Sequence, residues 1–186
     1  MRTFIALDLF PKPREAIERF LGNLKTELPG KRISWTKNNQ FHLTLDFLGN
    51  INETQQKELC QYLEEFPLPE GLQFSLHGLQ VFPNWKSPRV IWLGLSPGEP
   101  LIMLKNNLDP FLEKVNIPID KRGFIPHITL GRVKASLSRK EISILEENKN
   151  IELLKEIKFQ YFTFYQSILD RSGAQHIPLI RRPFPQ

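Results

Sequence analysis

Two short segments of the chain, His42-Leu43-Thr44-Leu45 and His127-Ile128-Thr129-Leu130, repeat the same order of residue types. Each places an imidazole and a hydroxyl two residues apart within an apolar run. Successive side chains of a β-strand point to opposite faces, so in a strand each histidine shares a face with its threonine. The other face is apolar and can pack against a core. The repeat therefore predicts two strands that each present a histidine and a threonine.

Two histidines presented in this way can act as a general acid and a general base on one substrate. A hydroxyl on the same strand face can donate a hydrogen bond to a phosphoryl oxygen. This combination suits phosphodiester cleavage without a metal ion, because one imidazole accepts a proton from the attacking oxygen and the other donates a proton to the leaving oxygen. The chain has four histidines, and we expect the other two, His77 and His176, to be solvated.

The composition argues against several other kinds of site. The sequence has no Cys/His cluster with zinc spacing and no Asp-rich calcium loop, so we expect neither a metal nor a cofactor. The single cysteine, Cys60, cannot form an internal disulfide, and we interpret it as structural. The net charge of +5 permits a phosphate-bearing substrate, although the basic residues are dispersed. Without an apolar run of membrane-spanning length or a signal peptide in residues 1–8, the chain is predicted to be cytoplasmic.

The elements that must position the two motifs are of mixed α and β type and alternate along the chain. Hydrophobic periodicity predicts strands over residues 3–9, 33–35, 41–48, 72–79, 90–95, 124–132, 157–169 and 176–180. It predicts helices over 14–28 and 101–115, and two more that begin after the N-caps Asn52 and Ser138. Each histidine strand lies between a long amphipathic helix and a capped helix. This repeated order of elements indicates a duplicated unit with one motif in each copy.

Strict alternation also assigns the neighbours of each motif to a face. In the first strand it places Asp46 beside His42 and Thr44, and Phe47 on the apolar face. In the second strand it places Arg132 on the face opposite His127. A β-bulge at Gly131 would bring Arg132 round to the histidine face.

The chain resembles the 2H phosphoesterase superfamily, which is named for its two His-x-Thr motifs. Among its members, it is most similar to the RNA 2′,3′-cyclic phosphodiesterases, also called 2′-5′ RNA ligases. The resemblance covers nearly the whole chain. It rests on residues 1–8, on Trp35 with residues 41–45 and 47–49, on residues 88–94, and on residues 124–132. Either motif alone is a weak signal, whereas the two together in these flanks are specific.

The resemblance implies a single bilobal α+β domain over residues 1–186, with two antiparallel sheets and flanking helices around a central cleft. The two lobes are related by a pseudo-two-fold axis, and each contributes one motif. The implied reaction is hydrolysis of the 2′,3′-cyclic phosphate at an RNA end to a 2′-phosphate, together with reversible 2′-5′ RNA ligation. The implied partners are RNA ends or nucleotides that bear such a phosphate. We expect a monomer that binds neither a membrane nor a metal.

The resemblance also assigns roles to the motif residues. His127 is the proton acceptor that activates water, and His42 is the proton donor to the departing 3′ oxygen. The two roles exchange when the reaction runs in reverse. Thr44 and Thr129 bind the phosphate, and Arg132 is a further candidate for phosphate binding.

Three aromatic residues, Trp35, Phe82 and Trp85, are candidates to stack on a terminal base, with packing in the core as the alternative for each. The chain departs from the family at His176, where the family often has a tyrosine. That departure leaves a stacking role at this position open.

Two other functions remain compatible with the sequence. One is a non-catalytic module with the same fold that binds RNA or a nucleotide, although the two intact motifs argue against it. The other keeps the chemistry but acts on a small nucleotide such as an ADP-ribose cyclic phosphate. The sequence does not separate this second alternative from RNA.

Overall fold

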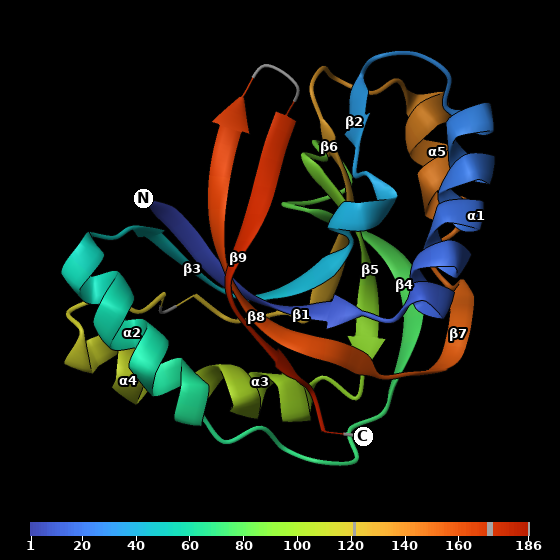
Figure 1. The fold of residues 1–186 in the computed structure, drawn as a ribbon. Helices are drawn as coiled ribbons and strands as arrows, with labels where there is room; N and C mark the ends of the chain where they lie inside the picture. Colours follow the sequence, from blue (N-terminus) through green and yellow to red (C-terminus); the bar gives the residue numbers. More distant parts are fainter. Residues whose placement is uncertain (121, 171–172, 186) are drawn as a thin grey trace.

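The structure is a computed structural model that describes residues 1–120, 122–170 and 173–185 (Figure 1). Its strands are β1 (Arg2–Leu9), β2 (Ile33–Trp35), β3 (His42–Asn50), β4 (Phe74–Phe82), β5 (Val90–Ser96), β6 (His127–Val133), β7 (Glu152–Ile157), β8 (Phe159–Asp170) and β9 (Gly173–Pro183). Its helices are α1 (Pro11–Glu27), α2 (Glu53–Glu65), α3 (Glu99–Asn106), α4 (Asp109–Lys114) and α5 (Arg139–Glu147), with a 3₁₀ turn η1 (Asn38–Gln40). The expected α+β class is confirmed.

All of the strand pairings are antiparallel, in the order β7-β4-β5-β6-β3-β1-β8-β9, with β2 paired to β6. The two sheets expected from the family resemblance are therefore joined into one. The joint between β3 and β6 consists of a single pair of partner residues, Leu43 and Ile128. Each of the two halves that meet there contributes one histidine strand.

Local sequence signals explain where the capped helices begin. The side chain of Asn52 accepts a hydrogen bond from the Gln55 amide at 2.9 Å, and the Asn52 amide donates to the Gln55 side chain in return. Ser138 and Glu141 form the same reciprocal capping box before α5. Each box satisfies amide groups that have no partner within the helix. Both predicted helix starts are confirmed.

The helices divide between the two halves of the sheet (Figure 1). Helix α1 packs against β7 and α5 against β4, whereas α2 packs against β9 and α3 against β3. Helix α1, which follows β1, therefore crosses over to cover the other half, and α3, which follows β5, does the same in the opposite direction. This exchange ties the halves together away from the β3–β6 joint.

The structure differs from the predicted elements in two places. The single helix expected over 101–115 is two helices, α3 and α4, because Pro110 in the first turn of α4 has no N–H to continue the α3 hydrogen-bond ladder. The strand stretch expected over 157–169 is β8, and it is preceded by a strand that was not predicted, β7, which pairs with β4 in the other half. Lys158 separates β7 from β8 and is the point at which the chain passes between the halves.

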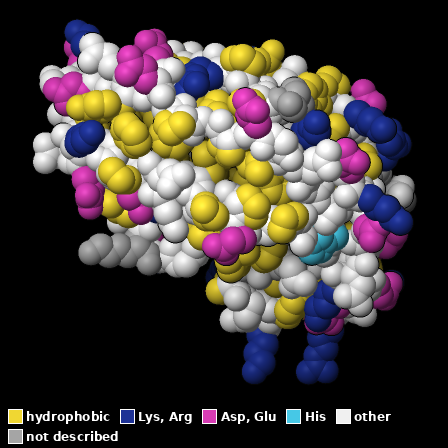
Figure 2. All heavy atoms as spheres, turned by 90° about the horizontal axis from the view of Figure 1, so that it is seen from below, with side chains coloured by type: hydrophobic (Ala, Val, Ile, Leu, Met, Phe, Trp, Pro, Cys, Tyr) yellow, Lys and Arg dark blue, Asp and Glu magenta, His cyan; other side chains and the backbone are white. Residues whose placement is uncertain are grey.

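The underside of the molecule carries α2, α3, α4 and the segment that connects α2 to β4. Figure 2 shows hydrophobic side chains across this face, with Lys and Arg interspersed among Asp and Glu. Met103 of α3 is 57% exposed there. Among the described residues, no helix has both the length and the apolar character needed to cross a membrane.

The close approach of β2 to β6 requires a glycine. A Cβ atom at Gly131 would lie 2.9 Å from Cε3 of Trp35 and 3.2 Å from the Ser34 carbonyl oxygen. We expect Gly131→Ala to lower the free energy of unfolding by about 1–3 kcal/mol, because β2 must shift to admit the methyl group. Urea unfolding measures this change.

Gly22, within α1, is the matched control because nothing lies within 4 Å of the corresponding Cβ position. Gly22→Ala should stabilise the protein by about 0.5–1 kcal/mol through helix propensity alone. Equal unfolding midpoints for Gly131→Ala and the wild type would contradict the proposed crowding.

Candidate functional site

The β3–β6 joint places the two motifs side by side. Leu43 and Ile128 are antiparallel partners, and both side chains are fully buried in the core. In antiparallel register the residues on either side of this pair are also neighbours, so His42 lies beside Thr129 and Thr44 beside His127. Because the leucine and isoleucine point into the core, these four side chains point to the opposite, open face.

Both motif strands contain a bulge at the same position, and it corrects the predicted faces beyond the motifs. The register of β3 against β1 skips Leu45, and that of β6 against β5 skips Leu130. Asp46 is consequently buried, and Phe47 is 55% exposed, the reverse of the prediction. Strict alternation placed Arg132 opposite His127, and this is also wrong, because the bulge, which lies at Leu130 instead of Gly131, turns the exposed Arg132 to the histidine face.

The two imidazoles are oriented by equivalent hydrogen bonds. Nδ1 of His42 lies 2.7 Å from the carbonyl oxygen of Gln40, and Nδ1 of His127 lies 2.7 Å from that of Ile125. A carbonyl oxygen can only accept, so Nδ1 carries the proton in each neutral ring, and Nε2 is left as the reactive nitrogen. Nε2 of His42 lies 3.1 Å from Oγ1 of Thr44, whose hydroxyl donates to it when the ring is neutral.

Burial keeps both rings neutral in the free protein. It lowers the pKa of His42 to about 4, with a smaller contribution of the same sign from His176. Burial also lowers the pKa of His127, and the nearby Arg132 adds to that effect. An anion bound between the rings opposes these shifts, because a nearby negative charge favours the imidazolium form.

Aromatic side chains enclose the His127 ring. Phe82 meets it edge-on with ring centroids 5.2 Å apart, and Trp92 lies at 5.5 Å. Phe82 and Trp92 also stack on each other at 4.7 Å. Phe82 was predicted as a candidate on sequence grounds, whereas Trp92 was missed. Trp92 lies in the apolar run of β5, and nothing in that run indicates from the sequence that the side chain faces His127.

A second aromatic group surrounds His42. Phe4 stacks on the imidazole at 5.2 Å, Tyr165 lies at 6.4 Å, and His176 meets the ring edge-on at 5.6 Å. The expectation that His176 is simply solvated is therefore wrong, because the curled β8–β9 hairpin brings it onto His42. Phe4 and Tyr165 were also missed, since each lies in a strand far from the motif in sequence.

The two other predicted aromatics, Trp35 and Trp85, have different surroundings. Trp35 lies over Gly131, where it packs β2 against β6. Trp85, in the loop after β4, lies under the Nζ atom of Lys149 at 4.3 Å from the ring centroid. Both rings also pack against the core. These contacts agree with the packing alternative.

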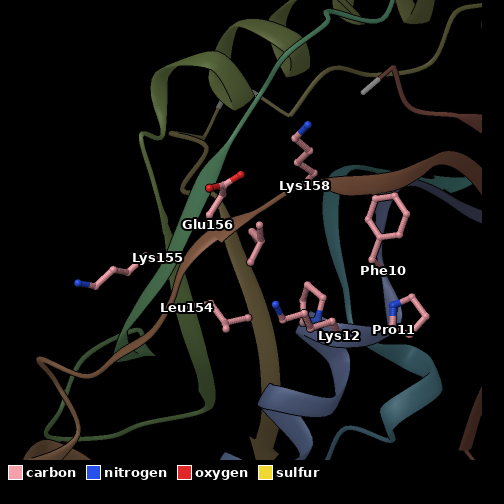
Figure 3. Close-up of a pocket in the computed structure, with 9 residues that line it drawn as sticks. Phe10, Pro11, Lys12, Leu154, Lys155, Glu156 and Lys158 are labelled. Carbon is pink, nitrogen blue, oxygen red and sulfur yellow. The ribbon is translucent and has the colours of Figure 1, made fainter.

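A cavity of about 660 Å³ lies away from the motifs, between the start of α1 and β7 (Figure 3). Lys12 and Leu154 extend toward each other across it, whereas Lys155 points away. None of the nine residues that line it belongs to the histidine strands. Elsewhere in the described part of the chain, no group of three or more His, Cys, Asp or Glu side chains is arranged to hold a metal ion.

Comparison with known proteins agrees with this geometry. A family model described as LigT like Phosphoesterase matches the chain twice, over residues 7–92 and 93–175. The RNA 2′,3′-cyclic phosphodiesterase of Archaeoglobus fulgidus is 31% identical over 173 residues, which cover 93% of this chain and 94% of the relative. The protein of that name from Aquifex aeolicus is 31% identical over 161 residues, covering 82% and 81%.

Solved structures share the fold. The protein TT0787 of Thermus thermophilus superposes with a TM-score of 0.82 at 26% identity, covering 99% of this chain and 98% of that one. Escherichia coli LigT complexed with 3′-AMP gives a TM-score of 0.77 at 26% identity, covering 100% and 98%.

The buried, Nδ1-protonated state of the two rings has a spectroscopic consequence. In the free protein both histidines should titrate below the ordinary value of 6.5, His42 at about 4. Two-bond ¹H–¹⁵N NMR spectra across a pH titration measure both the pKa and the tautomer. A neutral ring protonated on Nε2, or an ordinary pKa for His42, would contradict the described orientation and burial.

Proposed function

The chain belongs to the LigT like Phosphoesterase family, and on that premise we propose that it hydrolyses the 2′,3′-cyclic phosphate ends of RNA to 2′-phosphates without a metal ion. One observation carries this proposal. Two imidazoles, one from each half, belong to the strands that meet at the Leu43–Ile128 pair, and each has Nδ1 occupied by a backbone carbonyl, which leaves Nε2 as its reactive nitrogen. Such a pair can hold one proton donor and one proton acceptor around one phosphate.

In this reaction a water oxygen attacks the phosphorus atom and the bond from phosphorus to the 3′ oxygen breaks. Nε2 of His127 accepts the proton from the attacking water. Nε2 of His42, protonated in the substrate complex, donates its proton to the departing 3′ oxygen. When a 5′-hydroxyl replaces water as the attacking group, the same two proton transfers form the bond from phosphorus to the 5′ oxygen, break the bond to the 3′ oxygen and give 2′-5′ ligation. When ligation runs in reverse, the 3′ oxygen attacks, the 5′ oxygen departs, and the two roles exchange.

The remaining open-face groups suit the phosphate. The hydroxyls of Thr44 and Thr129 donate to its non-bridging oxygens, on which charge increases in the transition state. The guanidinium of Arg132 adds a fixed positive charge on the same face. The phosphate in turn raises the pKa of His42, whose ring is neutral before substrate binds.

Replacing either histidine should remove one of the two proton transfers. We expect His42→Ala and His127→Ala each to lower kcat on a nucleoside 2′,3′-cyclic phosphate by on the order of 10²-fold or more. His77→Ala is the matched control, because it removes a histidine from β4 that has no part in the mechanism, and it should retain activity. End-group analysis of the product should find a 2′-phosphate.

Near-full activity of both motif variants would contradict the proposal, and binding without turnover by the wild type would favour a binding module. Loss of activity after chelation that returns with added metal would contradict metal independence. Competition between an oligonucleotide and a mononucleotide at two salt concentrations separates RNA from a small nucleotide, since a polymer gives a steep salt dependence.

A further inference from the structure

The two motif histidines differ in the residue that faces each of them from the neighbouring strand. Asp8 of β1 is the antiparallel partner of His42, whereas Gly94 of β5 is the partner of His127. The second half also leaves little space for a side chain there, because a Cβ at Gly94 would lie 3.3 Å from the carbonyl oxygen of His77. The duplicated halves are thus chemically unequal at this position.

Asp8 is a buried carboxylate with an extensive set of donors, and it is only 2% exposed. It accepts hydrogen bonds from the hydroxyl of Thr163 at 2.7 Å and from that of Tyr165 at 2.8 Å. The guanidinium of Arg181 lies 3.4 Å from the carboxylate and also donates to the Tyr165 oxygen at 3.1 Å. These partners offset the cost of burying the charge. Burial and the Asp8 charge raise the pKa of Tyr165, so its hydroxyl remains a donor.

The charged groups around the two imidazoles differ in sign. His42 is faced by Asp8 from β1, by Arg14 from α1 and by His176 from β9. Burial, then His176, then Arg14 lower the pKa of His42, whereas the hydrogen bond to the Gln40 carbonyl and, after it, the Asp8 charge raise it. His127 is faced by Arg132, which has the same effect as burial and disfavours the protonated ring.

We propose that Asp8 is a positioning residue that supports His42 as the proton donor of the reaction, by favouring its protonated ring when the phosphate is bound. A carboxylate next to an imidazole favours the imidazolium form, and a guanidinium next to the other imidazole favours its neutral form. Once the phosphate adds its negative charge to the site, His42 takes up a proton more readily than a histidine without such a partner. This inference rests on the proposed function and adds Asp8 to the group of residues that serve its proton donor.

Two substitutions should move the pKa of His42 in opposite directions. Asp8→Asn keeps the size of the side chain and an oxygen acceptor but removes the charge, so it should lower the pKa. Arg181→Gln removes the cation that partly neutralises Asp8, so this substitution should raise the pKa of His42. NMR titration of the ring in the presence of adenosine 2′-phosphate measures both shifts, and the pKa of His127 should stay unchanged. Lys155→Gln, which removes an exposed cation from β7 in the other half, should move neither ring.

The kinetic readout separates electrostatics from loss of structure. Each unit of pKa shift changes the protonated fraction of His42 tenfold at a pH above its pKa, so we expect Asp8→Asn to lower kcat at neutral pH by about 10-fold with KM unchanged. A purely structural role would instead affect KM and stability and leave the titration of His42 where it was.

Shifts of both variants in the same direction, a shift of His127 instead of His42, or no shift would overturn the inference. If Asp8→Asn does not fold, the direction of the Arg181→Gln shift decides alone. If the wild type does not hydrolyse a cyclic phosphate, the proposed function fails. The titrations still show whether Asp8 controls His42.

Discussion

The site depends on a single antiparallel pairing, between Leu43 and Ile128, where the two halves of the sheet meet. Both side chains are fully buried. Because neighbouring residues on a strand alternate between faces, burial of this pair forces His42, Thr44, His127 and Thr129 onto the open side. The hydrophobic core therefore determines the direction of the polar side chains, and a slip of one residue in either strand would turn a histidine into the core.

The two histidine strands share the same backbone irregularity, but the charged groups near their histidines differ. A bulge at the fourth motif residue occurs in both strands, and it turns Phe47 out in one half and Arg132 in the other. Rings pack closely against both imidazoles, which lowers both pKa values by burial. The charges differ, with the Asp8 carboxylate near His42 and the Arg132 guanidinium near His127. This difference is how a duplicated scaffold can hold a proton donor and a proton acceptor.

The sequence predicted those features that depend on local patterns. The motif strands, the capping boxes at Asn52 and Ser138 and the shared face of each histidine and threonine follow from periodicity and capping chemistry. Strict alternation failed after Leu45, because a bulge is set by pairing with another strand and leaves no clear mark in a single segment. The approach of His176 to His42 depends on the curl of a hairpin more than a hundred residues away, which periodicity does not encode.

The central claim is that His42 and His127 act on one phosphate, and a ligand titration tests it most directly. Adenosine 2′-phosphate, the product of the proposed reaction on an adenosine end, is added to ¹⁵N-labelled protein while the ring signals of both histidines are followed. The account predicts that both signals respond along one 1:1 curve with the same Kd, and that both pKa values rise. A response from only one ring, or two different Kd values, would contradict it.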